Sequence, residues 1–373
     1  MRLRALAAGA VLAASCVGLH QPAVSGAEGQ DASAATARIK QLGGKSELNE
    51  VGRIVKVDLL DIEISDADVQ LVATLEDLRW LRLWGAGISD EGVRHLRKLT
   101  RLKTLGLLFT NMTDAGMAHL EDLTTLEALD LRGSARIGDP GLVRLKKLAG
   151  LTTLKLQTTG VTDAGLEHLK PLSGLTTLAL EQAVLTPAGL AKVAKYFPKL
   201  QELSLLGCEN VTDEGFESLA ALVALRRLVL RGTQVTGSGL AHLRAEGLEK
   251  LDLSQTSMTG DAMKHLARFP QLKWLNLWIT QIDNAGMKHL AGLSKLAWLN
   301  LDNTRVGNEG VRHLAGLKEL ETLDLRQTDI DDAALEYLKG LIRLKELTLS
   351  VTLVSEEGAA RLRAALPKCR IEK

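Results

Sequence analysis

The chain has 373 residues, 46% of them hydrophobic, and its 46 basic side chains are nearly balanced by 45 acidic ones. This balance argues against nucleic acid or an anionic membrane surface as the partner, because both are bound through a strong positive excess. The apolar fraction is ample for a large buried core, and length alone would suggest two or three ordinary domains.

The first residues are typical of an export signal. Arg2 and Arg4 give a positive start, and the apolar stretch 5–17 is too short to span a bilayer. The small residues that follow predict cleavage after Ala27 and export to the periplasm or the cell exterior. Cys16 leaves a lipid anchor open as an alternative, although the residue three places before it is not the larger aliphatic one preferred there. No second apolar segment of spanning length follows.

A short segment at 28–53 precedes a regular array. Residues 34–42 have helical apolar spacing and end at Gly43-Gly44. We expect this helix to cover the exposed core edge of the first repeat, because the end of a repeat array needs a cap.

The array itself is a self-similar repeat. The pair Leu-x-Leu recurs at intervals of mostly 24 residues, and the variant Val57-Asp58-Leu59 precedes it. This gives thirteen units from about residue 54 onward. The first leucines of the pairs are at positions 81, 105, 129, 154, 178, 203, 228, 251, 275, 299, 323 and 347.

Residues 151–172 show how one unit is built. Leu154 and Leu156 alternate with polar residues, which is the period of a strand with one buried face. Thr162 stands where a helix N-cap belongs, and Asp163 places a negative charge in the first turn. Leucines at helical spacing follow at positions 166, 169 and 172. Each unit is therefore predicted to be a strand, a turn and a helix.

Stacking such units predicts an α/β solenoid. Parallel strands lie about 4.8 Å apart, whereas packed helices need about 8–10 Å, so the array must curve with strands on the concave face and helices on the convex face. A helix at 356–366 and the segment Arg370-Ile371 are expected to close the other end. The predicted organisation is a signal peptide (1–27), an N-terminal cap (28–53), a repeat array (54–354) and a C-terminal cap (355–373).

The unit resembles the leucine-rich repeat superfamily, in particular the 24-residue bacterial type abundant in planctomycetes. Residues 157–166 (QTTGVTDAGL) and 108–117 (LFTNMTDAGM) match its "T-x-V-T-D-x-G-L" motif almost letter for letter. The resemblance implies a protein-interaction role and names no ligand. The repeat unit differs from commoner leucine-rich repeats because threonine stands where a turn asparagine is usual, at positions 110, 159, 233, 256, 280, 304, 328 and 352. A hydroxyl offers fewer hydrogen bonds there than an amide.

All five tryptophans fall at strand positions that flank core leucines, and are therefore expected on the concave face. Trp80 and Trp84 share one strand, with Leu60, Leu108 and Phe109 nearby. Trp274 and Trp278 share another, and Trp298 is the lateral neighbour of Trp274. The polar residues expected around the second group are Asp252, Asn276, Asn300, Asp302, Asn303, Asp324 and Arg326.

Exposed indoles rimmed by hydrogen-bonding groups are typical of interface hot spots. The predicted function is therefore a non-catalytic module that binds a protein partner on the concave face. Two alternatives stay open: the indoles stack on sugar rings of a cell-wall glycan, or they shield the sheet and have only a structural role.

The remaining reactive side chains follow the repeat rather than forming a site. Seven histidines occupy one helix position and lie too far apart to converge on a metal, so neither a metal site nor a cofactor is expected. The aspartates after the threonines (Asp114, Asp163 and Asp213) are attributed to helix-start electrostatics. Cys208 and Cys369 are read as ordinary thiols, and no nucleophile or acid–base constellation indicates an enzyme.

Overall fold

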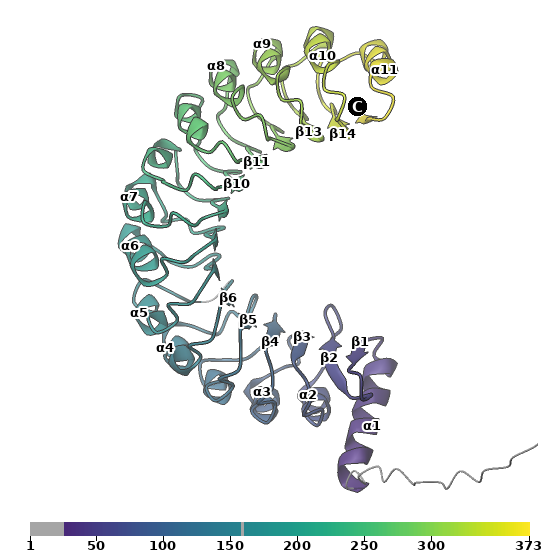
Figure 1. Cartoon of the computed structure of the whole chain (residues 1–373), viewed down its shortest axis with the longest axis vertical. Coiled ribbons are helices and arrows are strands. Elements are labelled where there is room, and N and C mark those ends of the chain that lie inside the picture. The colour runs from purple at the N-terminus through teal and green to yellow at the C-terminus, as the bar shows by residue number, and fades with distance from the viewer. Residues whose placement is uncertain (1–25, 158–159) are drawn as a thin grey trace, which may run out of the picture.

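The computed structural model describes residues 26–157 and 160–373, with side chains from residue 32 onward. Residues 1–25 of the predicted signal peptide (1–27) and residues 158–159, including the predicted turn residue Thr159, lie outside the described residues. The chain forms a curved solenoid in which strands line the inner rim and helices the outer rim, with the two ends of the array far apart (Figure 1). The predicted fold class is confirmed.

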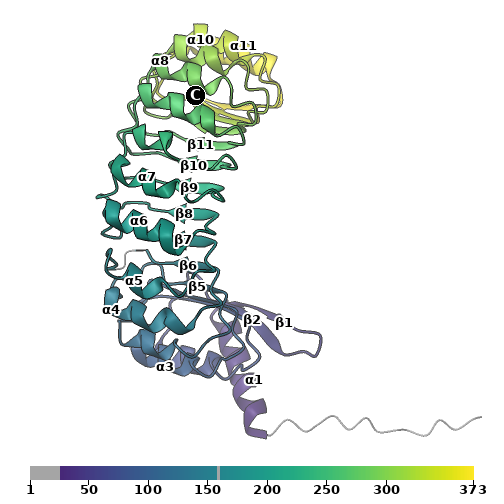
Figure 2. The ribbon, with the colours of Figure 1, turned by 60° about the vertical axis from the view of Figure 1, so that its left-hand side comes forward.

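The strands form one sheet of 15 members whose spatial order is the order in the chain (Figure 2). The first pair is antiparallel and every later pair is parallel, in continuous register. The strands are β1 Lys45–Leu48, β2 Ile54–Asp58, β3 Trp80–Trp84, β4 Thr104–Leu108, β5 Ala128–Asp130, β6 Thr153–Lys155, β7 Thr177–Ala179, β8 Glu202–Ser204, β9 Arg227–Val229, β10 Lys250–Asp252, β11 Trp274–Asn276, β12 Trp298–Asn300, β13 Thr322–Asp324, β14 Glu346–Thr348 and β15 Arg370–Glu372.

The outer rim is built from short helices, many of them 3₁₀ turns (η) rather than the α-helices expected from leucine spacing. One or two turns suffice, because each segment only has to bury its apolar face against its neighbours. The segments are α1 Gly26–Gln41, α2 Asp66–Val72, α3 Asp90–Leu96, η1 Gly116–His119, α4 Asp139–Leu142, η2 Val143–Lys147, α5 Leu166–Leu169, α6 Pro187–Tyr196, η3 Asp213–Gly215, α7 Phe216–Leu219, η4 Ser238–Ala241, η5 Asp261–Arg268, α8 Asn284–Met287, η6 Lys288–Leu290, α9 Asn308–Val311, η7 Arg312–Leu314, α10 Asp332–Leu338 and α11 Glu356–Ala365.

The core is one continuous column between the two rims. Both leucines of each Leu-x-Leu pair are buried, together with the leucines of the following helix. At the N-terminal end, α1 packs Ala35 and Ile39 against this column, and Arg38 forms an ion pair of 2.7 Å with Asp68 of α2. The strand β1, which the sequence did not indicate, adds a hairpin with β2 at this end.

Most of the turn threonines bond within their own repeats, whereas the Thr110 hydroxyl pairs with that of Ser134 in the next repeat at 2.8 Å. The Thr256, Thr280 and Thr304 hydroxyls donate to the carbonyl three residues earlier, at 2.5, 2.5 and 2.7 Å. Cys208 stands at the same position, but its thiol donates to Leu180 O of the preceding repeat, and burial raises its pKa to about 12. The threonine bonds within one repeat satisfy its turn backbone and do not link that repeat to the next.

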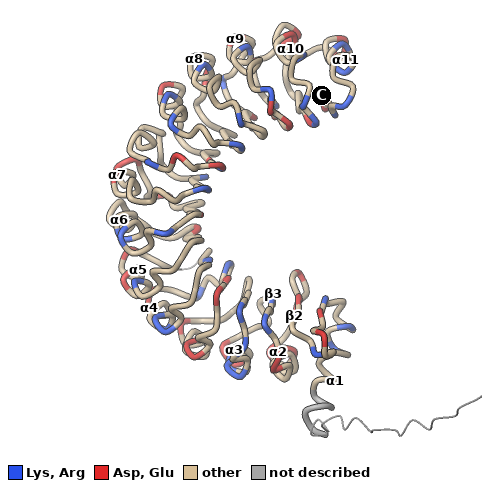
Figure 3. The backbone as a smooth tube through the Cα atoms, in the orientation of Figure 1, with Lys and Arg blue, Asp and Glu red and all other residues tan. Residues whose placement is uncertain are grey.

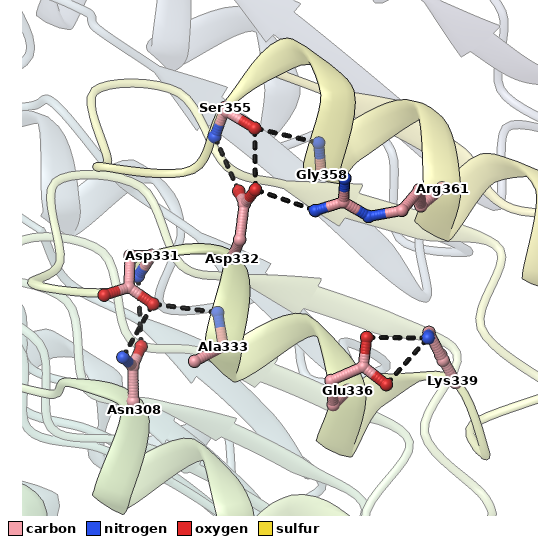
Figure 4. Close-up of polar contacts among 9 residues, drawn as sticks. All are labelled: Asn308, Asp331, Asp332, Ala333, Glu336, Lys339, Ser355, Gly358 and Arg361. Carbon is pink, nitrogen blue, oxygen red and sulfur yellow. Dashed lines mark hydrogen bonds and ion pairs between the residues drawn. The ribbon is translucent and has the colours of Figure 1, made fainter.

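Aspartate carboxylates at the helix starts link consecutive repeats by hydrogen bonds. Asp66 accepts the Ser89 backbone N–H (2.8 Å) and the Ser89 hydroxyl (2.5 Å) from the following repeat, and Asp332 does the same for Ser355 (Figure 4). We call this set the carboxylate ladder: Asp66, Asp90, Asp114, Asp139, Asp163, Asp213 and Asp332. The sequence-based explanation of these aspartates as helix-start charges alone was incomplete, because each carboxylate also holds the next helix start in place.

The ladder explains the glycine of the Thr-Asp-x-Gly motif. A Cβ at Gly92 would overlap the Asp66 carboxylate, and one at Gly358 would overlap Asp332. Glycine replaces the aspartate at Gly237 and at Gly260. The repeat after Gly237 carries Ala262 at the motif's glycine position, whereas the repeat after Gly260 keeps Gly286, where a Cβ would meet the Gly260 backbone.

One interruption leaves a measurable defect. Pro187 stands at the carboxylate position of α6, and the Thr212 hydroxyl of the next repeat is buried without a hydrogen-bond partner among the described residues. A buried hydroxyl without a partner costs about 1–3 kcal/mol.

Replacing Pro187 with aspartate should repair this defect. We expect Pro187→Asp to be more stable than the control Pro187→Ala by about 1–2 kcal/mol, because only the carboxylate can accept from Thr212. Chemical unfolding followed by circular dichroism measures the difference. It should shrink by about half in a Thr212→Val background, and an equal difference in both backgrounds would assign the gain to the helix dipole instead.

Candidate functional site

The tryptophans lie on the inner rim, as the strand alternation predicted. Trp80, Trp84, Trp274 and Trp298 are half-buried and alternate with fully buried leucines, so they point away from the core. Trp278 lies two residues after the end of β11, and the ladder of backbone bonds continues there, since Ile279 N–H donates to Asp302 O at 3.0 Å. We call Trp274, Trp278 and Trp298 the C-terminal tryptophan cluster.

Two members of this cluster stack on each other. Trp274 and Trp298 are paired in register, and their ring centroids lie 4.3 Å apart at an interplanar angle of 10°. This separation is close to the strand spacing of about 4.8 Å, so the rings stand on edge across neighbouring strands. The concave side therefore meets the ring edges, whereas one face of each ring is already covered by the other.

Trp278 is held from one side by an arginine. The guanidinium of Arg231 lies 5.0 Å from the centroid of its ring, and Arg231 Nε also donates to Gln255 Oε1 at 2.7 Å. The small, buried Ser254 on the intervening strand leaves room for this reach. The other lateral neighbour of Trp278 is Asp302. Arg231 did not figure in the sequence-based site, because it lies two strands away from the ring that it contacts.

Asparagines form the next row on the concave face. Asn276 Oδ1 accepts from Trp278 N–H at 3.2 Å, and Asn300 Oδ1 accepts from Asp302 N–H at 2.7 Å. Among residues 32–157 and 160–373, the Nδ2 groups of these two asparagines have no hydrogen-bond partner. Two amide donors therefore stand free beside the C-terminal tryptophan cluster.

Asp302 is the least satisfied polar side chain of the site. Only 7% of it is exposed, and its Oδ1 atom is buried with no hydrogen-bond donor in the part of the chain that the structure describes. Burial, reinforced by the nearby Asp324 carboxylate, raises the pKa of Asp302, and Arg326 offsets only part of that rise. The guanidinium of Arg326 is paired with Asp324 rather than with Asp302, and its Nη2 lies 3.8 Å from Asp324 Oδ2. Of the predicted polar rim, the Asp252 and Asp324 carboxylates each accept hydrogen bonds from the residue two positions later in the same repeat.

Ile279 completes the site and was missed by the sequence-based analysis. It follows Trp278, is 39% exposed, and has a backbone φ of 50°, in the left-handed region that a β-branched residue rarely adopts. It borders a polar hollow of about 490 Å³ that Gln255, Gln281 and Asn303 also line. The signal was present in the repeat, because four equivalent positions carry glycine; others carry larger residues that also have a positive φ, such as Gln255, Asn303 and Val351.

The N-terminal tryptophans, Trp80 and Trp84, already contact other side chains of the protein. Lys56 and Arg82 lie 5.1 and 5.2 Å from the Trp80 ring, so cations of the protein itself already use that indole. Trp84 contacts Phe109, with centroids 6.3 Å apart, and Phe109 is 52% exposed with a φ of 54°. Of the two predicted groups, the C-terminal one therefore offers more unpaired polar atoms.

A larger hollow lies away from the tryptophans. It measures about 1020 Å³, and its walls come from α1 and the C-terminal ends of α2 and α3. Its basic side chains, such as Arg97 and Lys98, lie where helix carbonyls end, so they complement the helix dipoles. Within residues 26–157 and 160–373, no three His, Cys, Asp or Glu side chains form a group that could hold a metal.

Comparisons with known proteins agree with this architecture. The family model described as "Leucine-rich repeat region" matches residues 50–291, more than half of the chain. The chain is a leucine-rich repeat protein. Domains of this family are typically protein-binding modules and generally non-catalytic, and no enzyme family matches. None of the curated proteins matches the chain.

Two bacterial structures illustrate the shared fold. An internalin from Listeria monocytogenes is 23% identical with a TM-score of 0.66, over 92% of this chain and 95% of the internalin. A leucine-rich repeat protein from Leptospira interrogans is 19% identical with a TM-score of 0.54, over 82% of this chain and 80% of that one. In the described part of this chain, no helix is both long and apolar enough to cross a membrane.

Removing the Ile279 side chain tests whether folding requires it. We expect Ile279→Gly to leave the thermal midpoint unchanged or to raise it, because the relief of a strained backbone, roughly 1–2 kcal/mol, offsets the lost contacts. The control Leu277→Ala removes a fully buried neighbour and should cost roughly 2–5 kcal/mol. A large loss in Ile279→Gly would make Ile279 an ordinary packing residue.

Proposed function

We propose that this protein binds a protein partner through the C-terminal half of its concave face, and that it has no catalytic role. The observation that carries the proposal is the pairing of Trp278 with Ile279. A β-branched side chain in a left-handed conformation, left partly exposed next to Trp278 in the chain, costs stability and buries little. A partner that covers it would turn this cost into interface contact.

The polar groups around the cluster support the same proposal. Interfaces combine aromatic anchors with a rim of hydrogen-bonding groups that the partner satisfies. Asn276 and Asn300 present free amide donors beside the stacked tryptophans, at neighbouring strands in register. An extended segment of a partner, lying across the strands, would supply backbone carbonyls to these donors.

A cell-wall glycan is the alternative ligand class, and the ring geometry favours it less. Sugar rings bind to the open faces of indoles, but Trp274 and Trp298 cover one face of each other and turn their edges toward the concave side. The glycan therefore serves as a competing outcome of the test below.

We place this binding outside the cytoplasm, in the periplasm or beyond, and assign the array to the planctomycete-type subclass. The first assignment rests on the sequence of residues 1–27, with lipid attachment at Cys16 as the alternative to a free exported form. The second rests on the Thr-Asp-x-Gly motif, whose aspartate and glycine are coupled by the carboxylate ladder.

Selection from a displayed library of random peptides tests the proposal. We expect selected peptides to lose binding by about tenfold or more with Trp278→Ala or Trp298→Ala, since hot-spot aromatics each contribute about 2 kcal/mol or more. The control Tyr337→Ala removes an exposed aromatic ring on α10, at the outer rim, and should leave binding unchanged.

Soluble peptidoglycan fragments form the competing arm of the experiment. Two results together would overturn the protein-partner proposal in favour of the glycan. The selected peptides would bind the two tryptophan variants as tightly as the wild-type protein, and the glycan would change the fluorescence in a way that Trp298→Ala abolishes. Thermal melts of each variant confirm that lost binding is not lost folding.

A further inference from the structure

The carboxylate of Asp302 is the most unusual polar group on the concave face. It accepts no hydrogen bond from any described residue, although comparable acids nearby are engaged: Asp252 accepts from Ser254 N–H and hydroxyl at 3.0 and 2.6 Å. A carboxylate that is more than nine-tenths buried and lacks a donor is destabilising, because it has lost its water without gaining a partner.

The neighbourhood favours a positive charge as that partner. Across β10–β14 the concave positions carry the acids Asp252, Asp302, Asp324 and Glu346, against Lys250 and Arg326. Arg326, the lateral neighbour of Asp302, is directed to Asp324 instead, at 3.8 Å. These concave positions therefore carry a local acidic excess, whereas over the chain as a whole both signs of charge are spread along the arc (Figure 3).

The indole beside Asp302 already binds a cation on one side. Arg231 lies 5.0 Å from the Trp278 centroid on the side of β9 and β10, whereas Asp302 lies on the side of β12. A cation over a tryptophan ring gains about 0.5–2 kcal/mol, and more when it is desolvated. A charged group at Asp302 would therefore meet a carboxylate and an indole together.

We propose that the partner inserts a lysine or arginine side chain between Asp302 and Trp278. This inference rests on the proposed function and specifies its chemistry: the partner segment is basic at this point, and its backbone lies against Asn276 and Asn300. The ammonium or guanidinium supplies the hydrogen-bond donors that Asp302 lacks within the chain.

A double-mutant cycle on the selected peptides tests this inference. Each lysine or arginine of a peptide that depends on Trp278 is replaced by norleucine, and binding is measured to the wild-type protein and to Asp302→Asn. We expect one position whose replacement costs at least about tenfold with the wild-type protein, with little further loss in Asp302→Asn, because the two changes remove one interaction.

Asp329→Asn is the matched control. It removes one negative charge from the following repeat at an exposed position away from the concave face, so it should leave the norleucine effect intact. Asp302→Asn should melt no earlier than the wild-type protein, because it removes a buried charge without a partner.

The outcomes separate this inference from the proposed function. Peptides that depend on Trp278 but carry no basic residue, or a norleucine effect that persists in Asp302→Asn, would overturn the inference and leave the concave binding site standing. A selection that yields no peptide dependent on Trp278 would overturn both.

Discussion

The structure depends on a hydrogen bond that crosses from one repeat to the next at the helix starts. Six of the seven aspartates of the carboxylate ladder accept from the backbone N–H and the hydroxyl of a threonine or serine in the following repeat, as Asp139 does for Thr162 at 2.8 and 2.6 Å. The glycine three residues after that threonine, Gly165, leaves space for the Asp139 carboxylate. The three residue types of the motif therefore describe one contact between neighbouring repeats, and two of its exceptions, at Pro187 and Gly237, alter the partner residue in the following repeat.

This contact lies on the outer side, which leaves the concave side free. Leucines fill the column between the rims, so the inner side chains of the short strands contribute little to folding. From residue 251 to 347 the repeat length is 24 without exception. This regularity brings Trp274 beside Trp298 and Trp278 beside Asp302, although each pair is 24 residues apart in the chain.

Much of this arrangement follows from the sequence alone. The 24-residue period predicted the solenoid, and the alternation of leucines with other residues predicted the strands and the inner position of the tryptophans. Both patterns depend on local spacing in the sequence. They did not predict β1, whose pairing is antiparallel and outside the period, or the 3₁₀ geometry of the outer segments. The residues of the polar rim were predicted together, but only the structure shows that Asp302 lacks a hydrogen-bond donor among the described residues, whereas Asp252 accepts from Ser254. Ile279 was missed because the glycines that recur at its repeat position, which indicate a positive φ there, were not used in the sequence analysis.

The most direct test of the central claim is fluorine NMR of protein that contains 5-fluorotryptophan, assigned by single replacement of the five tryptophans. On addition of a library-selected peptide, the account predicts saturable shifts for Trp274, Trp278 and Trp298, and none for Trp80 and Trp84. Shifts confined to Trp80 and Trp84, or binding that moves no tryptophan signal, would contradict the assignment of function to the C-terminal concave face.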